Sequence, residues 1–220
     1  MTVRYADAIA RLATLPEVLP PPPDALMPIR TDGLGWRLAG LPVEADARPA
    51  AVLVLIVPGD DGEALVVLTE RASRGGHHSG EVSFPGGKAE PGDADVVATA
   101  LREAAEEVAL DTVAAGVRVV GLLESFWIPV SSFRVTPVLA FAERRPALAR
   151  APDEVARILE APLHHFLPEA PIQTVERTIR KIPLRYGIYA VDDLAIWGAT
   201  ARVLGQLGAL LARQGPPGSR

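Results

Sequence analysis

The sequence of 220 residues contains no cysteine, which excludes disulfide bonds and every metal site built on thiolates. This absence fits a reducing compartment, and we expect a cytoplasmic location. The N-terminal stretch carries Arg4, Asp7 and Arg11 among its apolar residues, so it lacks the uninterrupted apolar segment of a signal peptide. The longest apolar runs, such as residues 50–57, are far shorter than the roughly 20 residues that span a bilayer. We therefore expect a soluble protein that has no membrane partner.

The sequence also lacks any run of lysines and arginines, and its formal net charge is -5. A chain of this charge repels phosphate polymers, so we expect no nucleic-acid partner. Hydrophobic residues make up 49% of the chain and charged residues 22%, which is the composition of a folded globular protein and excludes a disordered one. The length is sufficient for one large domain with a substantial core.

The strand signals lie in the middle of the chain. Residues 50–57 form a continuous apolar run rich in β-branched residues, which predicts a strand buried on both faces. After a turn signal at residues 58–62, residues 64–69 resume the pattern, so we expect an antiparallel hairpin. Further strands are predicted at residues 117–123 and 135–141.

Helical spacing is present in four places. It predicts a short N-terminal helix within residues 4–15, a helix at 97–108, a short helix at 153–159 and a long one at 195–212. The last is apolar on most sides, which indicates burial against the sheet or in a homodimer interface. Strands and helices therefore interleave around a mixed sheet, in an α+β arrangement. We expect three parts: residues 1–47 with the first helix and a proline-rich connector, a main domain at 48–213, and a disordered tail at 214–220.

The helix at residues 97–108 has two different sides. Its apolar residues recur at helical spacing and form one buried stripe: Val97, Leu101, Ala104 and Val108. Glu103, Glu106 and Glu107 stand at i, i+3 and i+4 and point away from that stripe. Like charges at this spacing destabilise a helix, and a bound divalent cation would offset the repulsion. The alternative for three glutamates considered alone is a solvated acidic face.

The sequence around this helix resembles the Nudix box. The box is a glycine, a spacer, an acidic residue, a longer spacer, and then Arg-Glu-x-x-Glu-Glu-x-Gly with an apolar residue. The matching residues are Gly87, Asp93, Arg102, Glu103, Glu106, Glu107 and Leu110. The chain departs from the pattern in having a loop one residue longer, as in the coenzyme A branch of the family, and in having Ala109 where the box has glycine.

Other segments resemble the signature of the coenzyme A pyrophosphatase branch. They are VLTERA at residues 67–72, FPGG at 84–87, SSFRVTP at 131–137 and IWGATAR at 196–202, so the resemblance covers about residues 48–204. Gly76 replaces the second arginine of the signature, and Arg74 lies two residues before it. At Ser132 the family usually has glycine.

The resemblance implies a Nudix fold, an α/β/α sandwich with a central mixed sheet flanked by helices, and a requirement for Mg²⁺ or Mn²⁺. Four residues are the expected metal ligands: Glu103, Glu106, Glu107 and the Gly87 carbonyl. Arg102 is expected to orient a glutamate, and residues of the glycine loop and its neighbourhood to bind the substrate: Gly86, Arg71, Arg74 and Lys88. For the catalytic base, Glu106, Glu124 and Glu81 remain alternatives.

The expected reaction is hydrolysis of the diphosphate bond of coenzyme A or an acyl-CoA, giving 3′,5′-ADP and 4′-phosphopantetheine or its acyl derivative. One alternative is a pyrophosphatase that acts on ADP-ribose, NADH or another nucleoside phosphate derivative, which Gly76 would allow. The other is a Nudix-type module that binds a nucleotide without cleaving it. The complete set of Arg102, Glu103, Glu106 and Glu107 favours an enzyme.

Overall fold

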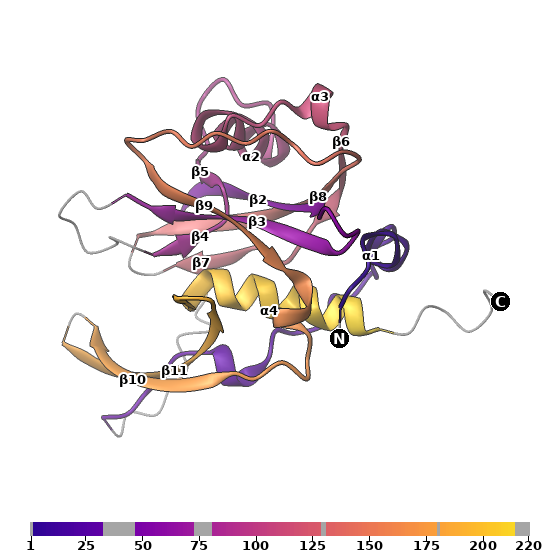
Figure 1. Ribbon diagram of the computed structural model, residues 1–220. Coiled ribbons are helices and arrows are strands. Elements are labelled where there is room, and N and C mark those ends of the chain that lie inside the picture. Colours follow the sequence, from indigo (N-terminus) through magenta and orange to yellow (C-terminus); the bar gives the residue numbers. More distant parts are fainter. Residues whose placement is uncertain (1, 33–46, 73–80, 129–130, 180, 214–220) are drawn as a thin grey trace.

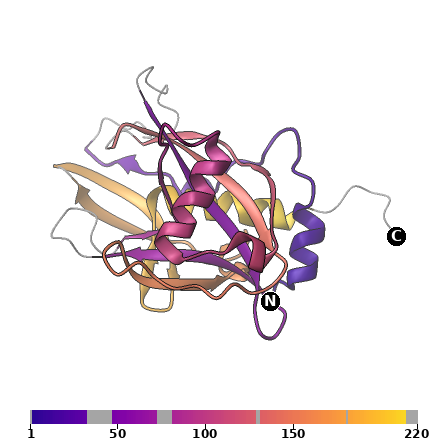
Figure 2. The same cartoon turned by 90° about the horizontal axis from the view of Figure 1, so that it is seen from above.

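The computed structural model describes residues 2–32, 47–72, 81–128, 131–179 and 181–213. Its largest element is an eight-stranded mixed sheet, which has helix α2 (Val96–Val108) on one face and helix α4 (Gly198–Ala212) on the other (Figure 1). Viewed from above, α2 crosses over the strands (Figure 2). The predicted α+β arrangement, a mixed sheet between helices, is confirmed.

Three long strands form the middle of this sheet. Strand β2 (Arg48–Pro58) pairs in parallel with β8 (Phe133–Ala142) and antiparallel with β3 (Ala64–Arg71), which confirms the predicted hairpin. The other strands are β4 (Val82–Ser83), β5 (Gly86–Lys88), β6 (Val117–Leu122), β7 (Phe126–Ile128) and β9 (Val155–Pro162). The order is β4-β3-β2-β8-β6, with β5 on β2, β7 on β8 and β9 on β3.

Strand β2 is buried on both faces, as its continuous apolar run predicts. Leu53 and Leu55 join the core under α2, whereas Val54 and Ile56 join the core on the α4 side. The α2 core receives Ala100, Ala104 and Val108 of the helix. This packing fixes the rotation of α2. Glu103 and Glu107 therefore lie at the flank of the apolar stripe, toward Gly86 and Gly87 of β5, and do not point away from the sheet as the sequence predicts.

A second, four-stranded sheet lies beyond α4 in Figure 1. It contains β1 (Ile29–Arg30), β10 (Gln173–Ile179), β11 (Ile182–Val191) and β12 (Leu194–Ile196), with β11 paired to the other three. The remaining helices are α1 (Tyr5–Leu12), α3 (Thr112–Ala115) and the 3-10 turns η1 (Asp24–Leu26) and η2 (Leu163–Phe166). None of the helices in the described part of the chain is both long and apolar enough to cross a membrane.

Two predicted helices differ from the structure. The long C-terminal helix begins at Gly198 rather than at residue 195, because residues 194–196 form β12. It is buried between elements of its own chain. The helix predicted at residues 153–159 is wrong, since residues 153–154 form a turn and residues 155–159 belong to β9, which pairs with β3. A segment of seven residues has too little helical stability of its own to resist pairing with an open strand edge.

The two ends of α2 are stabilised differently. At its N-terminus the Asp95 carboxylate accepts a hydrogen bond of 2.8 Å from the Ala98 N–H. At its C-terminus Ala109 adopts a left-handed conformation with φ 53° and ψ 37°.

A second non-glycine residue, Ser132 just before β8, has the same φ of 53° as Ala109. Both residues occupy positions at which the motifs have glycine, so the backbone keeps a geometry that a non-glycine residue adopts only at a cost.

We predict that Ala109→Gly raises the free energy of unfolding by about 1 kcal/mol, because glycine adopts this conformation without the steric cost of a Cβ. The Ala109 side chain is exposed, so no packing is lost. The matched control is Ala105→Gly, an exposed position inside the same helix. It should lower the free energy of unfolding by about 1 kcal/mol. Urea denaturation measures both, and a destabilised Ala109→Gly variant would contradict the assignment.

Candidate active site

The candidate site lies where α2 faces the glycine loop at β5. Glu107 is only 4% exposed, and its Oε2 accepts a hydrogen bond of 3.0 Å from the Gly86 N–H. Glu103, one turn earlier on α2, lies against Gly87. A Cβ on Gly87 would be 2.5 Å from Glu103 Oε1, so only glycine allows the backbone to approach the carboxylate this closely.

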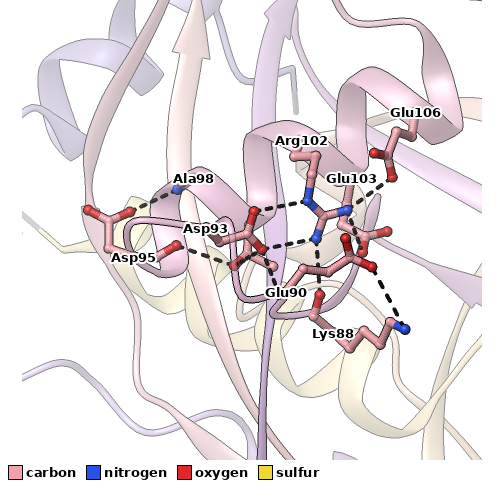
Figure 3. A network of polar contacts seen from close by, with 9 residues as sticks. Lys88, Glu90, Asp93, Asp95, Ala98, Arg102, Glu103 and Glu106 are labelled. Atoms are coloured by element: carbon pink, nitrogen blue, oxygen red, sulfur yellow. Dashed lines mark hydrogen bonds and ion pairs between the residues drawn. The ribbon is translucent and has the colours of Figure 1, made fainter.

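A guanidinium connects the loop to the helix (Figure 3). Arg102 donates from Nε to Asp93 Oδ1 at 2.9 Å and from Nη2 to Asp93 Oδ2 at 3.0 Å, a bidentate pair. The same Nη2 donates to the Lys88 carbonyl at 3.1 Å. Asp93 also accepts from the Thr99 hydroxyl at 2.9 Å and the Glu90 N–H at 2.9 Å. The loop between β5 and α2 is therefore tied to the first turns of the helix.

The same arginine reaches two of the predicted metal ligands. Its Nη1 donates to Glu103 Oε1 at 3.1 Å and to Glu106 Oε2 at 3.0 Å. Glu106 remains 58% exposed, in contrast to Glu107. Arg102 thus contacts two carboxylates on one side of α2. Its role in orienting a glutamate stays a prediction.

The pKa values separate the structural carboxylate from the others. Hydrogen bonds from Arg102 and from the Glu90 N–H hold the pKa of Asp93 well below its ordinary value, so Asp93 is ionised in its pair with Arg102. Burial raises the pKa of Glu107 to about 7, against the opposing effects of the Gly86 N–H and the Arg71 charge. Burial also raises the pKa of Glu103. Two carboxylates beside the glycine loop therefore lack full charge compensation.

A divalent cation fits this set of donors. Carboxylates and a glycine carbonyl are the hard oxygen ligands that Mg²⁺ and Mn²⁺ prefer. A cation beside Glu103 and Glu107 would also favour their ionised forms, which burial disfavours. Among the residues the structure describes, no three acidic or histidine side chains are already arranged around a common point. The oxygens of Glu103 and Glu106 are directed to Arg102, and Glu107 is directed to Gly86.

The predicted phosphate-binding residues are not all equally close to the carboxylates. Arg71, at the end of β3, is near enough that its charge lowers the pKa of Glu107. The Lys88 ammonium is 65% exposed and lies 3.7 Å from Glu90 Oε1. Arg74 falls outside the described residues. The structure therefore brings Arg71 and the backbone of Gly86 to Glu107.

Two of the three candidate bases lie elsewhere. Glu124 forms an ion pair of 3.1 Å with Arg202 of α4, on the face of the sheet opposite to α2. Glu81 precedes β4, and its charge raises the pKa of Tyr186 on β11 in the second sheet. Glu106 is the candidate that shares the helix face with Glu103 and Glu107.

Glu154 is a carboxylate of this site that the sequence did not reveal. Its charge raises the pKa of both Glu103 and Glu107. Its turn is fixed from two sides: the Ala151 N–H donates to the Glu107 carbonyl at 2.9 Å, and the Ala72 N–H donates to the Glu154 carbonyl at 2.9 Å. The incorrect helix at residues 153–159 concealed this residue, and no spacing relates it to the helix at 97–108.

Known proteins are similar to this chain over most of its length. A family model described as "NUDIX domain" matches residues 47–175. "Nudix hydrolase 22, chloroplastic" of Arabidopsis thaliana is 39% identical over 190 residues, which cover 84% of this chain and 62% of the relative. "Uncharacterized Nudix hydrolase NudL" of Yersinia pestis is 36% identical over 163 residues, which cover 74% of this chain and 79% of the relative.

This chain thus spans less than two thirds of the length of the plant relative. Among solved structures, a Nudix hydrolase of M. smegmatis, RenU, is 22% identical with a TM-score of 0.45, over 63% of this chain and 80% of that one.

We predict that metal-free protein loses stability as pH rises through the titration of Glu107. The folded-state pKa of about 7 exceeds the unfolded value of 4.5, so the folded state binds more protons between these values. The contribution of Glu107 to stability is therefore greatest below pH 4.5 and falls until pH exceeds about 7, by up to about 3 kcal/mol.

The measurement is urea denaturation with a chelator at about pH 5 and about pH 8, compared with Glu107→Gln, which keeps an acceptor for Gly86 but does not titrate. The other ionisable groups are common to both proteins, so the difference between them isolates Glu107. A difference that does not change with pH would show that Glu107 has no raised pKa.

Proposed function

The chain belongs to the Nudix hydrolase family, and from this premise we propose that it hydrolyses the diphosphate bond of coenzyme A or an acyl-CoA. The products would be 3′,5′-ADP and 4′-phosphopantetheine or its acyl derivative. The observation that carries the proposal is the approach of Glu103 and Glu107 to the Gly86-Gly87 backbone, with Arg102 holding the loop in place. In this proposal the diphosphate binds at the Gly86-Gly87 backbone, beside the carboxylates of Glu103 and Glu107.

Four groups would hold Mg²⁺ or Mn²⁺ in this proposal: Glu103, Glu106, Glu107 and the Gly87 carbonyl. The bound cation would neutralise phosphate charge and make a water nucleophilic. Arg102 acts as a positioning residue, because its guanidinium contacts both carboxylates and the loop. The Gly86 N–H and Arg71 lie beside Glu107, where they can bind phosphate oxygens.

The remaining roles are assigned by proximity. Glu106 and Glu154 are the carboxylates that can accept the proton of the attacking water, since Glu81 and Glu124 interact with elements on the other side of the sheet. We propose that Arg74 and Lys88 assist in phosphate binding. The choice of coenzyme A rests on the branch signature at residues 67–72 and 84–87. The cytoplasmic location and the homodimer remain predictions.

We predict that purified protein with Mn²⁺ or Mg²⁺ releases 3′,5′-ADP from coenzyme A, as measured by chromatography. Glu103→Gln and Glu107→Gln should each lower kcat by at least about 100-fold, because each removes a charge from the metal-binding face. The fold should survive, since the core side of α2 is unchanged. The control is Glu17→Gln, an exposed glutamate outside the site, which should leave kcat unchanged.

A panel containing ADP-ribose and NADH tests the substrate. Faster cleavage of one of these, with no 3′,5′-ADP from coenzyme A, would replace the proposed substrate while leaving the hydrolase assignment intact. Tight nucleotide binding without turnover at any metal concentration would instead indicate a binding module.

A further inference from the structure

The face of the large sheet that carries α2 changes from apolar to polar residues along β8. Val138 is fully buried in the core under the helix, whereas Thr136, two residues earlier, is 7% exposed. Arg134, two residues earlier again, is exposed. Residues at this spacing share one face of a strand. The apolar surface beneath α2 therefore gives way to a polar surface toward the beginning of β8.

Strand register connects this polar surface to the candidate active site. Gly87 pairs with Ala51, and Ala51 pairs with Thr136, so these residues form one row across β5, β2 and β8. Arg134 lies two residues before Thr136 on β8, on the same face of the sheet, and pairs with Trp127 of β7. The path from Gly87 to Arg134 crosses from β5 over β2 to β8 and then follows β8 for two residues. The usual spacings between strands and along a strand place the two Cα atoms about 12 Å apart. A nucleotide whose diphosphate lies at Gly87 could extend over this distance.

The Arg134 guanidinium on this surface is open to a ligand. The Arg134 guanidinium forms no hydrogen bond or ion pair with any residue that the structure describes. By contrast, Arg48, at the start of β2, lies over the Phe133 ring at 4.2 Å and donates to the Ser131 carbonyl at 2.9 Å. Arg134 is thus an uncommitted guanidinium on the same sheet face as Gly87.

The residues beside Arg134 suit a nucleotide. Ser125 and Thr136 share a hydrogen bond of 2.8 Å between their hydroxyls on this face. Trp127 stands opposite Arg134 and its side chain is partly exposed, although its indole N–H is buried and has no acceptor among the described residues. An aromatic ring can stack on a purine, and a guanidinium can bind a terminal phosphate with two hydrogen bonds.

We infer that Arg134 is a specificity-determining residue that binds the phosphate monoester on the ribose of the substrate, with Trp127 beside the adenosine. This inference rests on the proposed function, in which that group is the 3′-phosphate of coenzyme A. The chemistry of cleavage then depends on α2 and β5, and discrimination depends on β7 and β8. No residue of the box contributes to this subsite.

The test compares coenzyme A with dephospho-coenzyme A, which lacks only the 3′-phosphate. Arg134→Gln should lower kcat/KM for coenzyme A by about 10- to 100-fold, the range expected when a charge-assisted hydrogen bond is lost. The value for dephospho-coenzyme A should change less than about twofold, because that substrate makes no such contact. Arg118→Gln on β6, where the arginine is 71% exposed, is the matched control and should leave both values unchanged.

An equal loss for both substrates, or no loss for either, would overturn the inference. A binding measurement covers the case in which coenzyme A is not cleaved at all. Calorimetry should show that the unmodified chain binds 3′,5′-ADP more tightly than 5′-AMP, and that Arg134→Gln abolishes this difference. If coenzyme A is not a substrate but the difference is present, the proposed function fails and the subsite stands. If coenzyme A is cleaved but the difference is absent, the proposed function stands and the subsite at Arg134 fails.

Discussion

The bidentate pair between Asp93 and Arg102 is the interaction on which the candidate active site depends. It joins a loop that has no regular structure to a helix whose rotation is fixed by the core. The guanidinium also contacts Glu103, Glu106 and the Lys88 carbonyl, so one side chain sets the positions of the carboxylates and of the glycine strand. A lysine could not form these contacts together, because it lacks the planar fork of donors.

This arrangement places unfavourable features next to one another. Glu107 is buried without a full complement of charge partners, and burial raises its pKa to about 7. Gly87 leaves no room for a Cβ beside Glu103. The burial of Glu107 disfavours the folded state of the chain alone, and the apolar stripe of α2 offsets this cost by packing on β2 and β8. A site that is poorly compensated by its own protein is one that gains from binding a cation and a phosphate.

Much of this site could be predicted from the sequence, because it lies on one long amphipathic helix and the loop before it. The helical period alone separates Ala104 and Val108 from Glu103 and Glu107. Strand β9 could not be predicted, because residues 155–159 have a helix-like pattern and become a strand only through pairing with β3. Glu154 was missed for the same reason, since its position depends on that pairing.

Arg134 shows a second limit of the sequence. Its place beside the site depends on three pairings at once, those of β5 with β2, β2 with β8, and β8 with β7. The parallel pairing of β2 with β8 joins segments separated by the whole of α2 and β6, and such a pairing leaves no local pattern in the sequence. Helical spacing can therefore identify the carboxylates proposed to act on the diphosphate, whereas the residues proposed to select the rest of the substrate emerge only from the register of the sheet. The two groups can then vary independently, because they share a sheet face but no element.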